Sequence, residues 1–328
     1  MTVMVTGGAG YVGSHVVHEL QALGIPCVVV DSLVRGHREL VPNADVIVGD
    51  TRDAALMRRV IRDYRVDAVM HFAAYAYVGE SVAEPLTYYD NNVTATVSLL
   101  KTMVESDVKM MVFSSTCATY GLPETTPIHE DHPQHPINPY GATKMMVERI
   151  LRDVDRAHGL RSVVFRYFNA AGADRSGQIG EWHAPETHLI PLTLQAAAGR
   201  RTGVEIYGTD YPTPDGTCIR DYIHVTDLAQ AHVLGLRYLE SGEPSDAFNL
   251  GNGNGFSVRE VIGAAERIVG RPVKVVEASR RPGDPPILVG ASAKARQVLG
   301  WAPKLTTLDV IIETAWAWHR AHSQETRS

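Results

Sequence analysis

A tyrosine and a lysine stand four residues apart in the string NPYGATK, residues 138–144. On a helix of about 3.6 residues per turn, Tyr140 and Lys144 share one face, about one turn apart. A phenol beside an ammonium can act as a general acid and base, because the positive charge favours the phenolate. Many helices carry this spacing by accident, so the pair needs support from the rest of the chain.

Glycines that could cradle a dinucleotide follow the first apolar run directly. The string TGGAGYVG contains Gly7, Gly10 and Gly13 between an expected strand and an expected helix. Such glycines allow a tight turn, and the free amides at the helix start favour phosphate oxygens. Asp31 ends the second expected strand, near the ~20-residue offset at which a carboxylate binds the ribose hydroxyls of NAD. Arg35 lies nearby and could accept the extra phosphate of NADP, but the carboxylate favours NAD.

Hydroxyl groups follow the fifth expected strand, where doubly wound folds place their ligand-binding loops. Of Ser114, Ser115 and Thr116, any could bind a substrate hydroxyl and relay its proton to Tyr140. Bringing a tyrosine from a pKa of ~10 to about 7 needs roughly 4 kcal/mol of phenolate stabilisation. A lysine ammonium, the helix start that Asn138 caps and a nicotinamide cation are together expected to supply it.

The elements that must position these groups alternate along the first half of the chain. Between the apolar runs lie helical patterns such as 14–23 and 54–64. The apolar runs of strand length are 3–7, 27–31, 45–49, 68–74, 110–115 and 162–168. Strands that are apolar on both faces and separated by helices indicate a parallel sheet covered on both sides. We therefore expect an α/β fold with a doubly wound parallel sheet, a Rossmann fold.

The composition changes after Phe168, and Gly, Pro and polar residues recur up to Arg220. A helical pattern at 225–239 and an apolar run at 247–251 then resemble the alternating helices and strands expected in the first half of the chain. We expect a Rossmann domain made of 1–168 plus 222–251, and a smaller, discontinuous α/β substrate domain made of 169–221 plus 252–328. The final six residues, SQETRS, are typical of a frayed tail.

Bulk properties exclude several classes of protein. The formal net charge of −6 over 328 residues disfavours a general binder of nucleic acid or anionic membranes. No apolar run reaches the ~18 residues of a membrane span, and MTVMVTGG lacks the features of a targeting segment. Cys27, Cys117 and Cys218 lie far apart, which favours a reduced, cytoplasmic setting. No metal site is expected, although three histidines occur within 129–135.

The sequence resembles the extended short-chain dehydrogenase/reductase family over almost the entire chain, and within it the UDP-glucose 4-epimerases. The strings that carry the resemblance are VTGGAGYVGSH, VGESVAEPLTYYDNNV, FSSTCATYG, NPYGATKMMVE, RYFNAAGA, DGTCIRDYIHV and RRPGDPP. The resemblance implies a tightly held NAD that takes hydride from C4 of a UDP-hexose and returns it to the opposite face of a transient 4-keto sugar. It also implies a homodimer formed through helices of the first domain.

The resemblance also implies roles for single residues. Tyr140 would be the acid and base, Thr116 its hydroxyl partner and Lys144 the orienting cation. The cofactor-binding residues expected from the motifs and the resemblance are Gly7, Gly10, Tyr11, Val12, Gly13, Asp31, Ser32, Asp50, Thr51, Phe72, Ala73, Ala74, Asn91, Ser114, Tyr140, Lys144, Tyr167 and Phe168. The expected substrate-binding residues are Thr116, Tyr140, Asn169, Leu189, Tyr207, Arg220, Arg281 and Asp284. Both arginines suit a diphosphate, because a guanidinium binds phosphate as a planar fork.

Three positions depart from the family pattern: Ala76 replaces a lysine, Thr187-His188 replaces Asn-Asn, and Leu288 stands where room for an N-acetyl group is limited. UDP-pentose and UDP-N-acetylhexosamine 4-epimerases therefore stay open as alternatives. A nucleotide-sugar 4,6-dehydratase is disfavoured, because Cys117-Ala118 stands where its Asp-Glu pair is required. A non-catalytic NAD sensor, the alternative from another class, would be expected to have lost the catalytic tyrosine or lysine.

Overall fold

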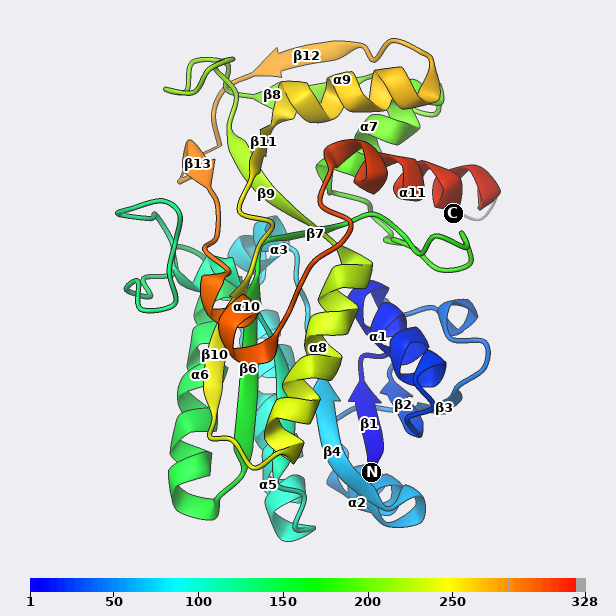
Figure 1. Cartoon of the computed structure of the whole chain (residues 1–328), viewed down its shortest axis with the longest axis vertical. Helices are drawn as coiled ribbons and strands as arrows, with labels where there is room; N and C mark the ends of the chain where they lie inside the picture. Colours follow the sequence, from blue (N-terminus) through cyan, green and yellow to red (C-terminus); the bar gives the residue numbers. More distant parts are fainter. Residues whose placement is uncertain (282, 323–328) are drawn as a thin grey trace.

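The computed structural model describes residues 1–281 and 283–322 (Figure 1). Pro282 of the RRPGDPP string and the expected tail at 323–328 lie outside the described residues. Within that part of the chain, no helix is both long and apolar enough to cross a membrane.

A seven-stranded sheet in the order β10-β6-β5-β4-β1-β2-β3 forms the lower half of the molecule in Figure 1. Every neighbouring pair in it is parallel. Its strands are β1 (Thr2–Thr6), β2 (Cys27–Asp31), β3 (Asp45–Val48), β4 (Val66–His71), β5 (Met110–Thr116), β6 (Arg161–Tyr167) and β10 (Asp246–Leu250). All seven apolar runs predicted to be strands lie in this sheet, which confirms the predicted Rossmann architecture.

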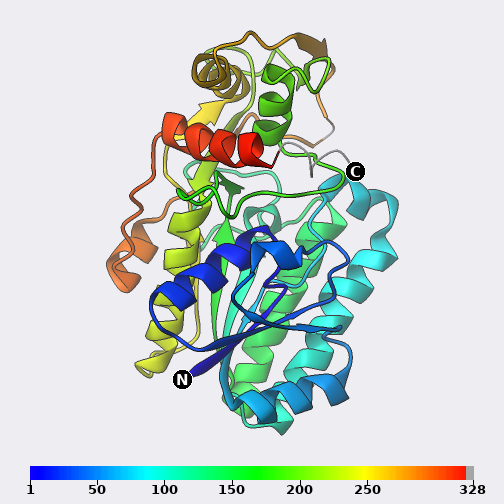
Figure 2. The ribbon, with the colours of Figure 1, turned by 90° about the vertical axis from the view of Figure 1, so that its right-hand side faces the viewer.

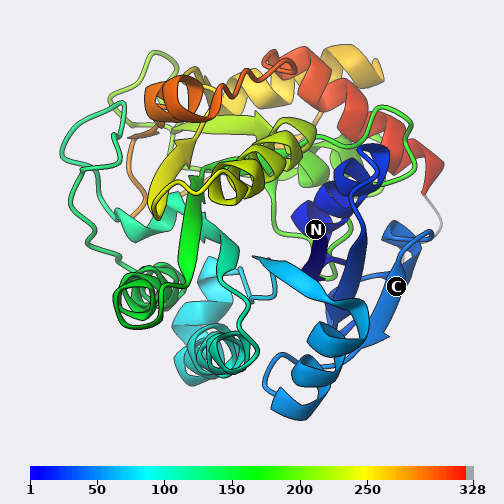
Figure 3. The ribbon, with the colours of Figure 1, turned by 60° about the horizontal axis from the view of Figure 1, so that its bottom comes forward.

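Helices cover both faces of this sheet, as Figure 3 shows from below. One face carries α1 (Tyr11–Ala22), α8 (Val225–Glu240) and α10 (Ala293–Leu299), and the other carries α2 (Ala54–Tyr64), α5 (Ala95–Glu105) and α6 (Pro139–His158). Strand β1 shows why both faces are apolar. Val3 and Val5 belong to the core on the α1 side, whereas Met4 belongs to the core on the α2 side. The alternation follows from the two-residue period of a strand.

Short helical segments connect the larger elements. After β4 the chain forms α3 (Val78–Ala83), α4 (Pro85–Tyr88) and a π-helical segment, η2 (Tyr89–Thr94), which leads directly into α5. Two 3₁₀ turns, η1 (Arg38–Leu40) and η3 (Cys117–Thr119), follow β2 and β5.

The upper part of Figure 1 is built from short strands and three longer helices, seen from the side in Figure 2. Strand β9 (Ile219–His224) pairs with β7 (Asn169–Ala171), β11 (Gly255–Ser257) and β13 (Ile287–Leu288), and β8 (Val204–Tyr207) pairs with β12 (Val275–Ala278). The helices are α7 (Leu189–Ala197), α9 (Val258–Val269) and α11 (Leu308–Ala321), which share one apolar core. This part of the chain holds most of the residues predicted to bind substrate.

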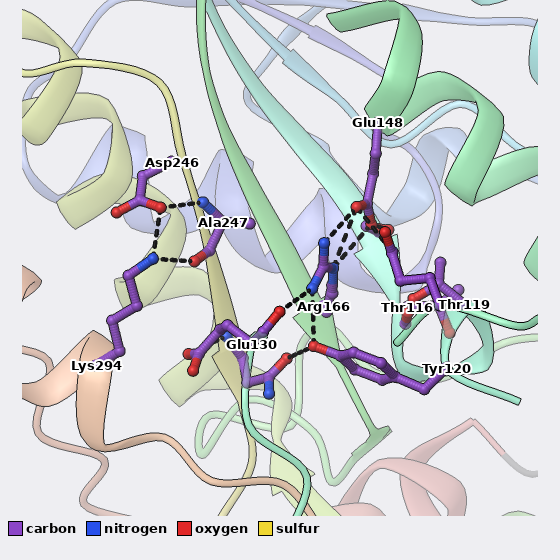
Figure 4. Close-up of polar contacts among 12 residues, drawn as sticks. Thr116, Thr119, Tyr120, Glu130, Glu148, Arg166, Asp246, Ala247 and Lys294 are labelled. Atoms are coloured by element: carbon purple, nitrogen blue, oxygen red, sulfur yellow. Dashed lines mark hydrogen bonds and ion pairs between the residues drawn. The ribbon is translucent and has the colours of Figure 1, made fainter. Parts of the chain in front are cut away.

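Segments that the domain prediction assigned to the second domain also contact the first. Ala295 and Leu299 of α10, with Trp301, lie in the core that covers the α1 side of the sheet. Lys294 donates a hydrogen bond of 3.0 Å to the carbonyl oxygen of Ala247 on β10 (Figure 4). The predicted domain boundaries stay a prediction.

Candidate active site

Helix α6 begins and ends where local signals in the sequence indicate. The side chain of Asn138 accepts a hydrogen bond of 2.8 Å from the amide of Gly141, and Pro139 occupies the first turn. The helix ends at Gly159, whose φ of +65° is left-handed and suits glycine. The predicted cap at Asn138 is confirmed. Tyr140 and Lys144 therefore lie in the first two turns, near the positive end of the helix dipole.

The ammonium of Lys144 is buried against the end of β5. Its Nζ donates a hydrogen bond of 2.7 Å to the carbonyl oxygen of Ser114 and lies 4.9 Å from the ring centre of Phe113. Burial lowers the pKa of Lys144 to about 7, and the nearby charge of Glu148 offsets this only in part. The lysine is thus held rigidly, and its charge is sensitive to pH near neutrality.

The phenol of Tyr140 lies near the hydroxyl of Thr116, the last residue of β5, close enough for that hydroxyl to lower the pKa of the phenol. Desolvation by the surrounding chain raises the pKa of Tyr140 above its ordinary value, and the hydroxyl of Thr116 opposes that rise. The sequence led us to expect a pKa lowered toward neutrality. The protein's own groups do the reverse, because the desolvation of the phenolate outweighs the effect of that hydroxyl. Additional positive charge beside the phenol is needed to ionise it.

A second tyrosine stands at the end of the neighbouring strand. The hydroxyl of Tyr167, on β6, is hydrogen-bonded to Ser114 Oγ. Phe168 follows it and packs with Cys117, Tyr120 and Ile128. The ends of β5 and β6 thus bring Ser114, Tyr167 and Phe168 together beside Lys144, and their role in cofactor binding stays a prediction.

A buried ion pair fixes α6 against β6. Arg166 and Glu148 form it with an Nη2–Oε2 distance of 2.6 Å, and their side chains are only 4% and 1% exposed. Ser115 donates a hydrogen bond of 2.6 Å to Glu148, and Arg166 donates one of 2.9 Å to the hydroxyl of Tyr120 (Figure 4). Our sequence reasoning missed this network. Its signal was a lone arginine inside the apolar strand SVVFRYF.

The glycine loop has the geometry expected of a phosphate cradle. Gly7 has a φ of +71°, and a Cβ there would lie 2.4 Å from the amide nitrogen of Ala73. A Cβ on Gly13 would lie 2.3 Å from the carbonyl oxygen of Gly7, whereas one on Gly10 would meet only that oxygen, at 3.4 Å. No side chain caps α1. Its first amides, at Tyr11 and Val12, are therefore free to bind an anion, which fits the pyrophosphate of NAD.

Asp31 lies at the end of β2, directly beside this loop. Its carboxylate accepts hydrogen bonds of 2.9 Å from the amides of Ala9 and Leu33. Burial raises the pKa of Asp31, and these two bonds oppose the rise. Each carboxylate oxygen keeps a free lone pair for a ribose hydroxyl, and Ser32 follows in an exposed position.

Arg35, which could have favoured NADP over NAD, instead contacts a carboxylate and two aromatic rings. Its Nη2 lies 2.6 Å and 2.7 Å from the two carboxylate oxygens of Glu80. Its guanidinium stacks on the rings of Tyr75 and Tyr77, at 4.3 Å and 4.6 Å from their centres. An arginine held this way is not directed at a 2′-phosphate, so the arrangement fits NAD better than NADP.

Of the remaining residues predicted to bind the cofactor, some adjoin the glycine loop and others do not. Phe72 and Ala73 donate their amides to the carbonyl oxygen of Thr6, at 2.8 Å and 3.0 Å, so the segment continuing to Ala74 adjoins the glycine loop. Asn91 donates a hydrogen bond of 3.1 Å to Asn92, a buried residue that the sequence reasoning missed.

Asn92 joins two parts of the site. It accepts a hydrogen bond of 2.8 Å from the amide of Tyr75 and donates one of 3.1 Å to Thr143 on α6. Asp50 pairs instead with Arg52 at 2.6 Å, and no hydrogen bond among the described residues joins it to the glycine loop. Thr51, next to it, is buried.

The predicted substrate residues come from β7, β8, β9, α7 and the segment before β13. Arg220 forms an ion pair with Asp284, and the guanidinium of Arg281 lies 3.9 Å from the ring centre of Tyr207. Asn169 donates a hydrogen bond of 3.0 Å to the carbonyl oxygen of Asp221. Leu189 is the first residue of α7. The structure therefore pairs each arginine with one other predicted residue, whereas Asn169 is bonded to Asp221, which was not predicted.

A family model described as the NAD dependent epimerase/dehydratase family matches residues 3–251. The chain belongs to this family. The UDP-glucose 4-epimerase of Azospirillum brasilense is 54% identical over 323 residues, 98% of this chain and 93% of that protein. That of Lacticaseibacillus casei is 50% identical and covers 99% of this chain and 98% of its own. The crystal structure of the Brucella ovis UDP-glucose 4-epimerase in complex with NAD superposes with a TM-score of 0.94 at 50% identity, covering 96% and 97% of the two chains. The resemblance inferred from the motifs is confirmed.

Within the epimerase/dehydratase family, the loop that follows β5 in this chain does not suit dehydration. Elimination of water needs an acid and a base, and Cys117 and Ala118 follow Thr116 instead of a carboxylate pair. Burial raises the pKa of the Cys117 thiol to about 12, so it stays protonated and cannot act as a base at neutral pH.

The structure shows the surroundings of two residues that depart from the family pattern, Ala76 and His188. Ala76 stands between Tyr75 and Tyr77, the two tyrosines on which Arg35 stacks. The guanidinium of Arg35 therefore lies near the position at which relatives carry a lysine. His188 joins a cluster with Glu181, His183 and Glu186. Our sequence reasoning missed this cluster, although the string HAPETH, with two histidines and a glutamate in six residues, was a readable signal.

Proposed function

We propose that this chain is an NAD-dependent epimerase that inverts C4 of a UDP-hexose, interconverting UDP-glucose and UDP-galactose. The observation that carries the proposal is the Tyr140 phenol placed near the Thr116 hydroxyl, one helical turn from the buried ammonium of Lys144. Relatives about 50% identical over nearly the whole chain are UDP-glucose 4-epimerases, which supports the same substrate class.

Tyr140 and Thr116 handle the proton. As phenolate, Tyr140 takes the proton of the sugar 4-hydroxyl, directly or through Thr116, while C4 loses hydride and becomes a ketone. Bound NAD supplies the hydride acceptor and donor, and its oxidised ring adds positive charge that favours the phenolate. Tyr140 returns the proton to the 4-oxygen when hydride reaches the opposite face of C4. Proton and hydride both return to the sugar, so the reaction consumes no oxidant.

Lys144 positions the phenol and adds charge. Its bond to the Ser114 carbonyl holds the ammonium at the end of β5, the strand that also carries Thr116. Lys144 is therefore the orienting cation of the proposal. Since burial lowers its pKa to about 7, part of the population is neutral at pH 7, and bound anionic groups would favour the charged form.

Arg220 and Arg281 are proposed to hold the diphosphate of the UDP-sugar. The side chain of Arg220 is 12% exposed and already paired with Asp284, so its charge is oriented before the substrate binds. Stacking on Tyr207 restricts Arg281 in the same way. Guanidinium forks held in place lose less side-chain entropy when they bind phosphate.

We further propose a homodimer in the cytoplasm, with a role in galactose metabolism. Val78, Val82, Leu86 and Met146 expose apolar side chains on α3, α4 and α6, which lie against one another in the first part of the chain. An apolar patch of this kind supports a dimer interface. The three free cysteines support a reduced compartment. Light scattering on the protein and on a Leu86→Glu variant tests the dimer, which should dissociate in the variant.

The decisive experiment gives the purified protein UDP-galactose without added NAD and measures UDP-glucose with a coupled assay. Turnover without net cofactor consumption is expected. Rates on UDP-N-acetylgalactosamine and UDP-arabinose, measured in parallel, rank the hexosamine and pentose alternatives. A protein that binds NAD and UDP-sugar but shows no turnover on any of the three would overturn the proposal in favour of a sensor.

A further inference from the structure

Four side chains that take no part in the proposed reaction converge in the loop between β7 and α7. They are Glu181, His183, Glu186 and His188, and each offers one ligand atom within 4.8 Å of the other three. Two imidazoles and two carboxylates are a donor set that suits a divalent transition-metal ion. They come from eight consecutive residues, so the loop itself forms the whole cluster.

The distances within the cluster suit coordination. Glu181 Oε1 lies 3.2 Å from His183 Nδ1 and 2.7 Å from His188 Nδ1. The carboxylate of Glu186 lies 3.6 Å from His183 Nδ1 and 3.2 Å from His188 Nδ1. In a tetrahedral zinc site with bonds of ~2.1 Å, ligand atoms stand ~3.4 Å apart. The observed spacings bracket that value, so small side-chain movements would complete the site.

Two of these ligand atoms are buried without a hydrogen-bond partner. Glu181 is 5% exposed, and neither its Oε1 nor His183 Nδ1 makes a hydrogen bond with acceptable geometry in the described part of the chain. Buried polar atoms normally have partners, because leaving one unpaired costs free energy. A cation at the centre of the cluster would satisfy both atoms at once.

The ligands are held in place by contacts outside the cluster. The indole of Trp318 donates a hydrogen bond of 3.0 Å to the carbonyl oxygen of Glu181. Glu186 Oε1 accepts hydrogen bonds of 2.7 Å and 2.8 Å from the amides of Thr187 and His188. This support resembles the outer shell that orients ligands in metal sites. His188 is exposed at the surface, so an ion has a path into the site.

The cluster lies where this loop meets the predicted cofactor site. Tyr11, the first residue of α1, donates a hydrogen bond of 2.6 Å to the carbonyl oxygen of Gly172. The rings of Tyr11 and Tyr77 meet His183 edge-on, at centre distances of 6.1 Å and 5.9 Å. Figure 2 shows the loop, in green, passing between α11 and α1. An ion there would brace the loop, and with it the start of α7, against the glycine loop.

We propose that Glu181, His183, Glu186 and His188 form a structural site for one zinc ion per chain. Four protein ligands close the coordination sphere, which is typical of a structural zinc rather than a catalytic one. The competing explanation is a network of ion pairs alone, since the two carboxylates raise the pKa of His183 to about 9.

The test uses the full chain with its bound cofactor and without a histidine tag, treated with a chelator, freed of it and titrated calorimetrically with ZnCl₂. We expect one Zn²⁺ per chain with a micromolar or lower Kd, and at least a hundredfold loss of affinity in His188→Ala. The matched control is His158→Ala, also at an exposed histidine, which should bind zinc like the wild type. X-ray absorption should show two nitrogen and two oxygen neighbours at ~2.0–2.1 Å.

Thermal unfolding supplies a second readout. Zinc should raise the midpoint of the wild type and of His158→Ala but not that of His188→Ala, because only an ion bound to the folded state stabilises it. Circular dichroism checks that each variant folds. Sub-stoichiometric zinc in the wild type, or equal affinity in His188→Ala, overturns the proposal and leaves the ion-pair network as the explanation.

Discussion

Replacing Lys144 by methionine should stabilise the protein while removing its activity. Burial lowers the pKa of this lysine from 10.5 to about 7. At ~1.4 kcal/mol per pH unit, keeping the ammonium folded costs on the order of 5 kcal/mol below pH 7. Methionine has a similar length and no charge. It leaves the Ser114 carbonyl without its bond, which costs ~1–3 kcal/mol. The net expectation is a gain of about 2–4 kcal/mol at pH 6.

The sign of the pH dependence is fixed by linkage. Between pH 7 and 10.5 the unfolded chain holds the lysine proton and the folded chain does not, so wild-type stability rises with pH across this window. Lys144→Met lacks this term. Its advantage should therefore shrink by about 3 kcal/mol between pH 7 and 9.5.

Urea midpoints, followed by tryptophan fluorescence on cofactor-free protein at pH 6, 7 and 9.5, measure the difference. Lys101→Met, at an exposed lysine of α5, is the matched control and should show no difference that varies with pH. A Lys144→Met protein that is less stable than the wild type at pH 6, or whose advantage does not change with pH, would refute the reasoning. A functional residue often lowers the stability of the folded protein, so replacing it is expected to raise stability while activity is lost.

Further substitutions, at Tyr140, Thr116 and the Arg166–Glu148 pair, separate the roles of neighbouring groups. Tyr140→Phe should lower kcat by ~10³-fold or more and keep bound NAD, read from the absorbance spectrum of the purified protein. Thr116→Ser should stay near wild type in the coupled assay, whereas Thr116→Val should lose ~10²-fold because the relay hydroxyl is gone. Arg166→Met should lower the free energy of unfolding by ~3–5 kcal/mol, because it strands the buried Glu148, and adding Glu148→Gln should recover part of the loss in urea titrations.

Much of the fold could be predicted because its signals are local. Strands such as β2 are apolar on both faces, and that pattern needs no tertiary information to read. Helix α6 carries its own start at Asn138 and its own stop at Gly159. The meeting of Tyr140 with Thr116 could be anticipated for a related reason: parallel strands end at the same edge of the sheet, so residues that follow them converge.

The electrostatics of the site could not be predicted in this way. A sequence shows that Lys144 follows Tyr140 by one turn, but it does not show how much water each side chain loses. In the structure that loss raises the pKa of Tyr140 and lowers the pKa of Lys144. Burial is set by chain segments far away in sequence, and so is the pairing of Arg166 with Glu148.

The predicted substrate-binding region was even harder to predict from the sequence, because its strands pair with partners far away along the chain. Strand β13 is two residues long and carries no readable pattern, yet it places Leu288 beside Arg220 of β9. There Leu288 packs against the core of Cys117 and Phe168, next to the catalytic Thr116 of the proposal. From the sequence, only the size of Leu288 could be judged. In the structure, its position is fixed by contacts with Cys117 in the loop after β5 and with Phe168. If the proposed function is correct, β13 and that loop would jointly set the room for the sugar, and a change at position 288 should alter substrate preference and turnover together.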